Sequence, residues 1–196
     1  MPDYLSSLAE GMNFLEGIPE EELRKAKART RSVTVRKGAF FLQAGEVPGR
    51  IGYLKSGLLR LFYIDLNGDE VNKHFCLENT LAISYSAFLQ QTESRFFIQA
   101  LEDSRLVTIG YDAYQELLAG HMCWQIVARK LAEMVFILKE KREAELLLSD
   151  AQERYQQFLA DYPNLEKRIA QYHIASYLGI TPESLSRIRA KWFANL

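Results

Sequence analysis

The sequence predicts an α+β fold in which an antiparallel, jelly-roll-like β-roll is followed by one long helix and a small helical domain. From about residue 31 to 111, short β-prone runs alternate with glycines. From about residue 111 to 148 apolar residues recur at helical spacing, and beyond that point short helical segments are separated by turn residues. The expected domains are a β-roll with an N-terminal helix over 1–112, the long helix over 113–148 and the helical domain over 149–196.

The composition is that of an ordinary globular protein. Of the 196 residues 48% are hydrophobic and 25% are charged, and the formal net charge is −1. No apolar run approaches the ~18–20 residues that span a bilayer, and the first residues lack the basic start and apolar stretch of a signal peptide. We therefore expect a cytoplasmic protein. Cys76 and Cys123 stand far apart without a paired motif, so we expect both to be buried, with no disulfide, metal or other cofactor.

The clearest turn signal of the β-roll is the dipeptide Asn67-Gly68. It lies between two β-prone runs, at 58–64 and 71–76. Both central residues of a type I′ turn need positive φ, which asparagine and glycine tolerate best. We predict a β-hairpin with this turn type, and we expect Glu70 to be solvated near its tip.

The long helix is expected to have two apolar faces. One stripe steps by about 3 and 4 residues in turn, which is the spacing of a helix that packs against another helix. A second apolar set lies at Ile126, Val135 and Ile137, so one face can cover the β-roll while another pairs with a second copy of the chain. We expect a helix-mediated homodimer, and the alternative is that the stripe only covers the β-domain. The predicted dimerisation residues are Trp124, Val127, Leu131, Met134 and Leu138.

Four shorter helices complete the expected structure. One should precede the roll over 19–29, because a proline and three glutamates are followed by basic residues. In the last domain we expect helices over 149–160, with Ser149 as the cap, and then over 165–177 and 181–193.

The stretch IAQYHIASYLGITPESLSRIRAKW has the layout of a helix-turn-helix. Ala175 allows close approach of the two helices, and Gly179 suits a turn that needs positive φ. Thr181 can cap the second helix, and Pro182 fits its first position, where a missing N–H costs nothing. From residue 162 onwards there are five basic residues and two acidic ones, so this tail can meet phosphates although the whole chain is slightly acidic.

The second helix of this motif is expected to present a polar face to DNA. Leu185, Ile188 and Trp192 share its buried side, whereas Arg187 points away from them. Arginine can donate two hydrogen bonds to guanine, and Glu183 can accept one from cytosine. The alternative is that Glu183 and Arg187 form only a surface ion pair. The predicted DNA contacts are Thr181, Glu183, Ser184, Arg187 and Lys191, together with Tyr172 and His173 on the preceding helix.

In the order of its parts and in these motifs the chain resembles the Crp/Fnr regulators. The resemblance runs from about residue 24 to 191 and is sharpest in GEVPGRIGYLKSGLLRLFYIDLNGDEV and TPESLSRI. It implies a homodimer that binds a pseudo-palindromic site on double-stranded DNA and contacts RNA polymerase, with Glu183 and Arg187 at the family's base-contacting positions. Pro182 stands where a basic residue is usual, so the specificity should differ. The family's β-wing has no evident counterpart before Leu196, so the helix alone is expected to hold the DNA.

We do not expect the family's cyclic-nucleotide pocket to operate in this chain. The resemblance implies a Gly-Glu pair for the ribose and an arginine for the phosphate. The segment ENTLAISYSAF has no Gly-Glu pair, Ser94 aligns with the arginine, and Arg95 comes one residue late, which in a strand turns it to the opposite face. A phosphate buried without a cation would cost several kcal/mol. Cyclic AMP is therefore not the expected effector, and an unknown small-molecule effector or an empty scaffold stays open.

Two other classes of function are the main alternatives. An enzyme on a β-roll or cupin barrel gathers two or three histidines and an acid around a metal, and only His74 lies in the roll. No Walker loop or GxGxxG motif is present, so we expect no enzyme. The second alternative is a ligand-binding or protein-interaction module whose tail does not bind DNA. Salt-dependent DNA binding would separate it from a regulator.

Overall fold

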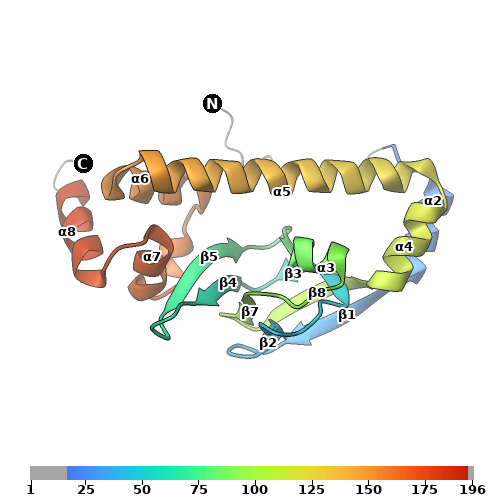
Figure 1. Ribbon diagram of the computed structural model, residues 1–196, viewed down its shortest axis with the longest axis horizontal. Helices are drawn as coiled ribbons and strands as arrows, with labels where there is room; N and C mark the ends of the chain where they lie inside the picture. Colours follow the sequence, from blue (N-terminus) through green and yellow to red (C-terminus); the bar gives the residue numbers. More distant parts are fainter. Residues whose placement is uncertain (1–16, 194–196) are drawn as a thin grey trace.

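The computed structural model describes residues 17–193 and shows a β-roll, a long helix beside it and a helical tail at one end (Figure 1). The roll consists of two four-stranded antiparallel sheets, with the strand orders β1-β8-β3-β6 and β2-β7-β4-β5. The predicted α+β class and its jelly-roll-like first part are confirmed. The strands are β1 (Thr30–Val35), β2 (Phe40–Leu42), β3 (Arg50–Ser56), β4 (Leu59–Ile64), β5 (Glu70–Cys76), β6 (Leu81–Ala82), β7 (Phe97–Ala100) and β8 (Ser104–Gly110).

Helices occupy the two ends and one side of this roll. The predicted N-terminal helix is confirmed, with Pro19 as its N-cap rather than its first residue. Among the described helices none combines the length and apolar character that a membrane crossing needs. The helices are α2 (Glu20–Ala28), α3 (Tyr85–Gln90), α4 (Tyr111–Ala119), α5 (Met122–Leu148), α6 (Ala151–Asp161), the 3₁₀ helix η2 (Leu165–Lys167), α7 (Gln171–Leu178) and α8 (Pro182–Phe193).

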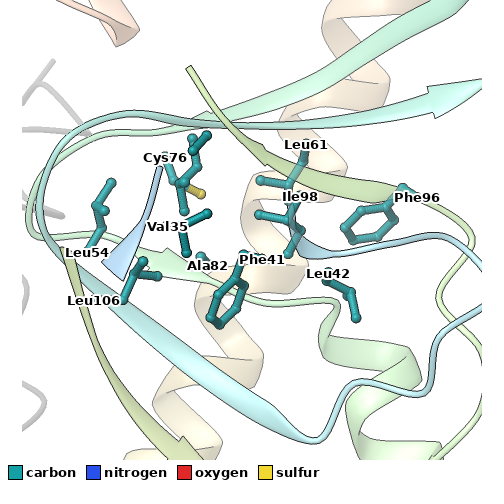
Figure 2. Packing of buried hydrophobic residues seen from close by; sticks show 12 residues of the cluster. Val35, Phe41, Leu42, Leu54, Leu61, Cys76, Ala82, Phe96, Ile98 and Leu106 are labelled. Carbon is teal, nitrogen blue, oxygen red and sulfur yellow. The ribbon is translucent and has the colours of Figure 1, made fainter. Parts of the chain in front are cut away.

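Aliphatic and aromatic side chains from both sheets fill the interior of the roll. Leu54, Ile98 and Leu106 are fully buried there, and Figure 2 shows them among the other side chains of this cluster. Cys76 is also fully buried, as predicted. A Cβ atom on Gly52 would lie 2.6 Å from Cδ2 of Leu106, so β3 needs glycine at this point to approach the core so closely.

The predicted hairpin is present, but its turn is of another type. β4 and β5 pair antiparallel, and Gly68 has a φ of +89°. Asn67 does not have positive φ, so the turn is not type I′. Instead the carboxylate of Asp65 accepts hydrogen bonds from the backbone N–H groups of Asn67 and Asp69, at 2.8 and 2.9 Å. This local cap stabilises the turn with one positive-φ residue instead of two.

The helix predicted over 113–148 is divided into α4 and α5. The helix is interrupted at Gly120, whose φ of −82° and ψ of −102° are not helical. The side chain of His121 then caps α5 by accepting a hydrogen bond from the backbone N–H of Cys123. Cys123 is half-buried rather than buried. From there α5 runs along one side of the roll (Figure 1). The indole N–H of Trp124 donates to Glu22 of α2 at 2.8 Å, which fixes the start of α5 against the N-terminal helix.

The tail begins one residue later than predicted. Ser149 ends α5, and Asp150 is the N-cap of α6, so the prediction that Ser149 is the cap is wrong. The Asp150 carboxylate accepts from the backbone N–H groups of Gln152 and Glu153, and the Glu153 side chain accepts from the N–H of Asp150 in return. This reciprocal capping box outcompetes a lone serine. The helix predicted over 165–177 is also divided, into η2 and α7.

The tail packs directly on the roll. α7 lies beside β5 in Figure 1, and a second apolar cluster joins the two parts. From the roll it contains Leu58 and Phe75, both almost completely buried. The rings that the tail contributes are those of Tyr155, Phe158, Tyr162 and Tyr177. We call the whole cluster the roll–tail cluster; its other buried members are Leu165, Ile174, Ala175, Leu178 and Leu185.

Candidate nucleic-acid interface

Helix α8 starts as its sequence predicts. Gly179 has a φ of +69° and ends α7 in the left-handed conformation. The hydroxyl of Thr181 accepts a hydrogen bond from the backbone N–H of Ser184 at 3.2 Å, which is the N-cap arrangement. Pro182 is the first residue of α8. The turn and the cap therefore set the direction of this helix through local interactions.

The two faces of α8 differ sharply in exposure. Leu185 is completely buried in the roll–tail cluster, and Ile188 is partly buried beside it. On the opposite side Glu183, Arg187 and Lys191 are exposed. The side chain of Trp192, which was predicted on the buried face, lies outside the described residues. The polar face required of a helix that reads DNA is thus open to solvent.

Contacts within the first turns order this exposed face. The Arg187 guanidinium donates to the hydroxyl of Ser184 at 3.3 Å. Hydrogen bonding from its own backbone N–H and from Thr181 lowers the pKa of Glu183, so its carboxylate stays ionised at neutral pH. An acceptor and a bidentate donor therefore stand four residues apart on one helix face, at the spacing of adjacent turns.

Not all of the tail's basic residues are available to a partner. Arg168 pairs with Glu78 and Glu102 of the roll, at 2.8 Å each, and donates to the carbonyl of Gly57. Arg189 lies 3.9 Å from Glu166. The excess of basic residues in this segment therefore serves partly to hold the tail in place, and Arg187 and Lys191 are the exposed cations of α8.

The two predicted contacts on α7 behave differently. Tyr172 is 55% exposed, whereas His173 is only 4% exposed and faces the roll. Nδ1 of His173 lies 3.3 Å from both the Arg60 guanidinium and the Asn72 amide. His173 cannot reach a phosphate from this position, so its prediction as a DNA contact is corrected. The sequence feature that could have indicated a buried polar partner is Arg60, a charged residue inside the apolar run LLRLFYI.

Two residues of the predicted dimerisation stripe of α5 are buried within the chain itself. Trp124 and Leu131 are 7% and 5% exposed, so they are not accessible to a second copy. Val127, Met134 and Leu138 are half-buried on the same side. Trp124 is held by Glu22 of α2, and dimerisation through the three half-buried residues stays a prediction. Helical spacing showed which residues share a face, but not which partner covers it.

The opposite face of α5 exposes apolar side chains. Met122 and Phe136 are 63% and 65% exposed, and Ile126 and Ile137 are 44% and 45% exposed. Two of them belong to the second apolar set noted in the sequence, whereas Val135 of that set is half-buried. An exposed apolar stripe of this length on one helix is typical of a contact surface.

The two positions aligned with the family's phosphate-binding arginine direct no cation to the interior. Ser94 is buried, and its hydroxyl lies 3.0 Å from that of Ser84 and donates to the carbonyl of Phe96. Arg95 is exposed on the other side, as its one-residue offset predicts. Ser84 lines an adjacent cavity of about 350 Å³, together with Phe41, Leu42, Glu46, Arg50, Ile83 and Ile98.

The three histidines do not assemble with other possible ligands. His74 is packed against the tail, where its Nδ1 lies 2.8 Å from the hydroxyl oxygen of Tyr162. Burial lowers the pKa of His74 to about 4. Within residues 17–193, no group of three or more His, Cys, Asp or Glu side chains is arranged to hold a metal ion.

Comparison with known proteins gives matches over most of the chain. Residues 32–121 match the cyclic nucleotide-binding domain family. The anaerobic regulatory protein of Haemophilus influenzae is 28% identical over 178 residues, which cover 83% of this chain and 66% of that protein. The chain thus spans just under two thirds of the length of this relative.

Solved structures share the complete arrangement of roll, long helix and tail. FixK2 from Bradyrhizobium japonicum superposes with a TM-score of 0.72 at 19% identity, covering 85% of each chain. A transcriptional regulator of the Crp/Fnr family from Eubacterium rectale also gives a TM-score of 0.72, at 17% identity, covering 93% of this chain and 87% of its own. At these identities the structural matches establish the fold.

Proposed function

We infer from the match to the cyclic nucleotide-binding domain family and from the resemblance to Crp/Fnr regulators that this chain is a transcription regulator. We propose that it binds DNA as a homodimer through α8. The observation that carries the proposal is the exposed polar face of α8, with its apolar face buried in the roll–tail cluster. Such a helix can enter the major groove while the rest of the tail supports it.

Roles follow from the chemistry of each exposed side chain. Arg187 has the planar pair of donors that matches O6 and N7 of guanine, and Glu183 is an acceptor for N4 of cytosine. Ser184 and Lys191 extend the same face, and Thr181 positions its start. Tyr172 is exposed on the preceding helix and is available to a phosphate. No step of this function requires a catalytic group.

The homodimer is proposed to form through the exposed face of α5. That face carries Ile126, Phe136 and Ile137, whereas Trp124 and Leu131 of the stripe first predicted are buried within the chain. Two copies paired in parallel along α5 would place their α8 helices at the same end of the dimer, and a pseudo-palindromic site needs them about 34 Å apart. A cytoplasmic location and contact with RNA polymerase are expectations of this proposal.

The role of Arg187 is tested by its replacement with alanine. Sites would first be selected from random DNA by the full chain, and affinities measured across all base substitutions at each position. We expect Arg187→Ala to weaken binding by about 1–3 kcal/mol and to relax specificity at one base pair of each half-site. Arg36→Ala removes an exposed arginine of the roll and should change neither. Unchanged binding and specificity in Arg187→Ala would reject the assignment.

The dimer surface is tested by placing a charged side chain at its apolar centre. Phe136→Glu should convert the dimer to monomer in analytical ultracentrifugation, because it places two carboxylates at the proposed contact. Glu140→Gln changes a polar residue of α5 that is also exposed and should leave the dimer intact. A dimer that persists in Phe136→Glu at micromolar concentration would show that another surface is used.

The alternative function, a ligand-binding module without DNA binding, predicts a different salt response. Phosphate contacts release counterions, so log K should fall linearly with log salt concentration. Absence of DNA binding at low salt would favour the module. Cyclic AMP should not bind in titration calorimetry, because Ser94 replaces the expected arginine and Arg95 is on the opposite face.

A further inference from the structure

Lys73 has an unusual environment for a lysine. It lies on β5, on the part of the roll close to α5, and its amine is 4.3 Å from the centroid of the Phe96 ring and 5.6 Å from that of Tyr63. The two rings pack edge to face with their centroids 5.6 Å apart. Phe96 is buried and Tyr63 is 36% exposed. The amine therefore rests on an aromatic surface that remains accessible from one side.

The charges around Lys73 are positive. The charge of Lys139 of α5 acts on Lys73, and that of Arg95, on the segment before β7, acts on Tyr63. Both are exposed. Within the part of the chain that the structure describes, none of the three cations forms an ion pair with a carboxylate. Lys73 thus lies over two aromatic rings, and two further cations without an ion pair, Lys139 and Arg95, are near enough to act on it or on Tyr63.

Burial and the neighbouring positive charge favour the neutral amine, against the attraction of the rings for the charged form. Burial, followed by the charge of Lys139, lowers the pKa of Lys73 to about 8. At pH 7 about one tenth of such a group is neutral, against less than about one thousandth for a lysine with a pKa of 10.4. The neutral amine is the nucleophile, and desolvation beside a second cation is a known way to activate lysine. Lys73 should therefore react where ordinary surface lysines do not.

We propose that Lys73 is a site of reversible covalent modification by a carbonyl compound that carries an anionic group. The lone pair of Nζ attacks the carbonyl carbon and forms a C–N bond. The two protons of the amine nitrogen leave together with the carbonyl oxygen as water, and an imine remains. The reaction needs no oxidant or reductant. The anionic group would face Lys139 and Arg95, and the rest of the compound would lie on Tyr63 and Phe96. The proposal does not depend on DNA binding.

The test uses the full chain and pyridoxal 5′-phosphate, an aromatic aldehyde with a phosphate group. After incubation at pH 7 the imine is reduced with borohydride and the labelled lysines are identified by peptide mass mapping. Lys55 is the matched control, because its amine lies 5.0 Å from the Tyr53 ring centroid but the residue is exposed. We expect Lys73 to be labelled at least about tenfold more than Lys55, in line with the lowered pKa of Lys73.

Two variants and a second probe separate the parts of the proposal. Lys73→Arg keeps the charge and should remove the dominant label, whereas Lys55→Arg should not. Pyridoxal, which lacks the phosphate, should label Lys73 several-fold less, and Lys139→Gln should lower labelling by pyridoxal 5′-phosphate. Labelling of lysines in simple order of exposure, with Lys55 equal to or above Lys73, would overturn the reactive site. Equal labelling by the two probes would overturn its preference for anions.

Discussion

The two apolar clusters of the molecule are built differently. The roll core lies entirely between residues 35 and 106 and consists mainly of aliphatic side chains from both sheets. The roll–tail cluster joins residues 58–75 of the roll to residues 155–185 of the tail and is dominated by aromatic rings. The roll can bury its core without the tail, whereas the tail completes its core only with Leu58 and Phe75 of the roll. The position of the tail therefore depends on the roll, and not the reverse.

Polar contacts at the edge of the roll–tail cluster make this packing specific. Arg60 is 4% exposed, pairs with Glu70 at 2.5 Å and with Gln99, and stacks on the Phe62 ring. Glu70 is thus an ion-pair partner and not simply a solvated residue of the hairpin tip. On the other side Arg60 approaches His173 of α7. A buried cation with several partners tolerates few alternative positions of the tail, because each would leave it unpaired.

The largest expected effect comes from a cavity in the roll–tail cluster. Phe158 is 1% exposed and touches the rings of Phe75, Tyr162 and Tyr177. Phe158→Ala should lower the free energy of unfolding by about 3–5 kcal/mol. Hydrogen exchange should show lost protection in α6, α7 and α8, with the strands of the roll still protected.

Leu106→Ala is the matched change in the roll core, where the side chain is completely buried. This change should lower the free energy of unfolding by about 2–5 kcal/mol. It should also lower hydrogen-exchange protection in both the roll and the tail, because the tail packs on the roll. If Phe158→Ala exposes the strands of the roll as much as the tail, the two clusters form one cooperative unit and the proposed asymmetry is wrong.

The same difference explains how much the sequence could predict. Features set by near neighbours were found: the hairpin at Gly68, the turn at Gly179 and the capped start of α8 at Thr181. The turn type failed because Asp65 satisfies the backbone with its own carboxylate. Propensities describe the average residue in a turn and do not include this particular side-chain bond.

Features set by distant partners were missed. His173 was expected at the surface because nothing near it in the sequence indicates Arg60, which lies 113 positions away. Trp124 was assigned to a second copy because its partner, Glu22, belongs to a helix 102 positions earlier. Periodicity gives the face of a helix, and tertiary packing decides what covers that face.

The pH dependence of the tail's attachment is the next largest effect. Arg60 can only donate hydrogen bonds, so Nδ1 of His173 must accept and the imidazole is neutral. Burial and then the charge of Arg60 lower the pKa of His173 to about 4, against the influence of Glu70. The unfolded chain takes up this proton near pH 6.5, whereas the folded chain does so only near pH 4. The stability that the neutral His173 contributes to the folded protein is therefore fully present above pH 6.5 and is lost as the pH falls towards 4.

Urea denaturation at a series of pH values measures this loss. The slope for one histidine is at most about 1.4 kcal/mol per pH unit. His74, whose pKa burial lowers to about 4, contributes in the same direction. His173→Gln should therefore reduce the slope between pH 4 and 6.5 by roughly half rather than abolish it. An identical slope in the variant and the wild type would mean that His173 is not held neutral by this contact.

A smaller effect is expected from the ion pairs of Arg168. Its guanidinium binds Glu78 and Glu102, and hydrogen bonding from Arg168 lowers the pKa of Glu78. All three side chains are about one third exposed, so solvent weakens the attraction. Arg168→Met should lower the free energy of unfolding by about 1–2 kcal/mol at pH 7, because two carboxylates are left facing one another. The difference from wild type should shrink as the pH falls below 4.5, towards the lowered pKa of Glu78, and its carboxylate is protonated. A difference that does not change with pH would indicate lost packing instead.

The smallest effect concerns a single hydroxyl between α7 and the hairpin. Ser176 donates to the carbonyl of Glu70 at 2.6 Å and accepts from the backbone N–H of Asn72 at 2.9 Å, so it continues the hydrogen bonding of β5 into the tail. Ser176→Ala leaves both backbone groups without this partner and should cost about 1 kcal/mol. Ser186→Ala alters an exposed serine of α8 and should be neutral within about 0.5 kcal/mol. Because the roll core does not contact Ser176, added exchange in Ser176→Ala should be confined to α7 and the adjoining end of β5. Equal stabilities of the two serine variants would show that aromatic packing alone positions the tail.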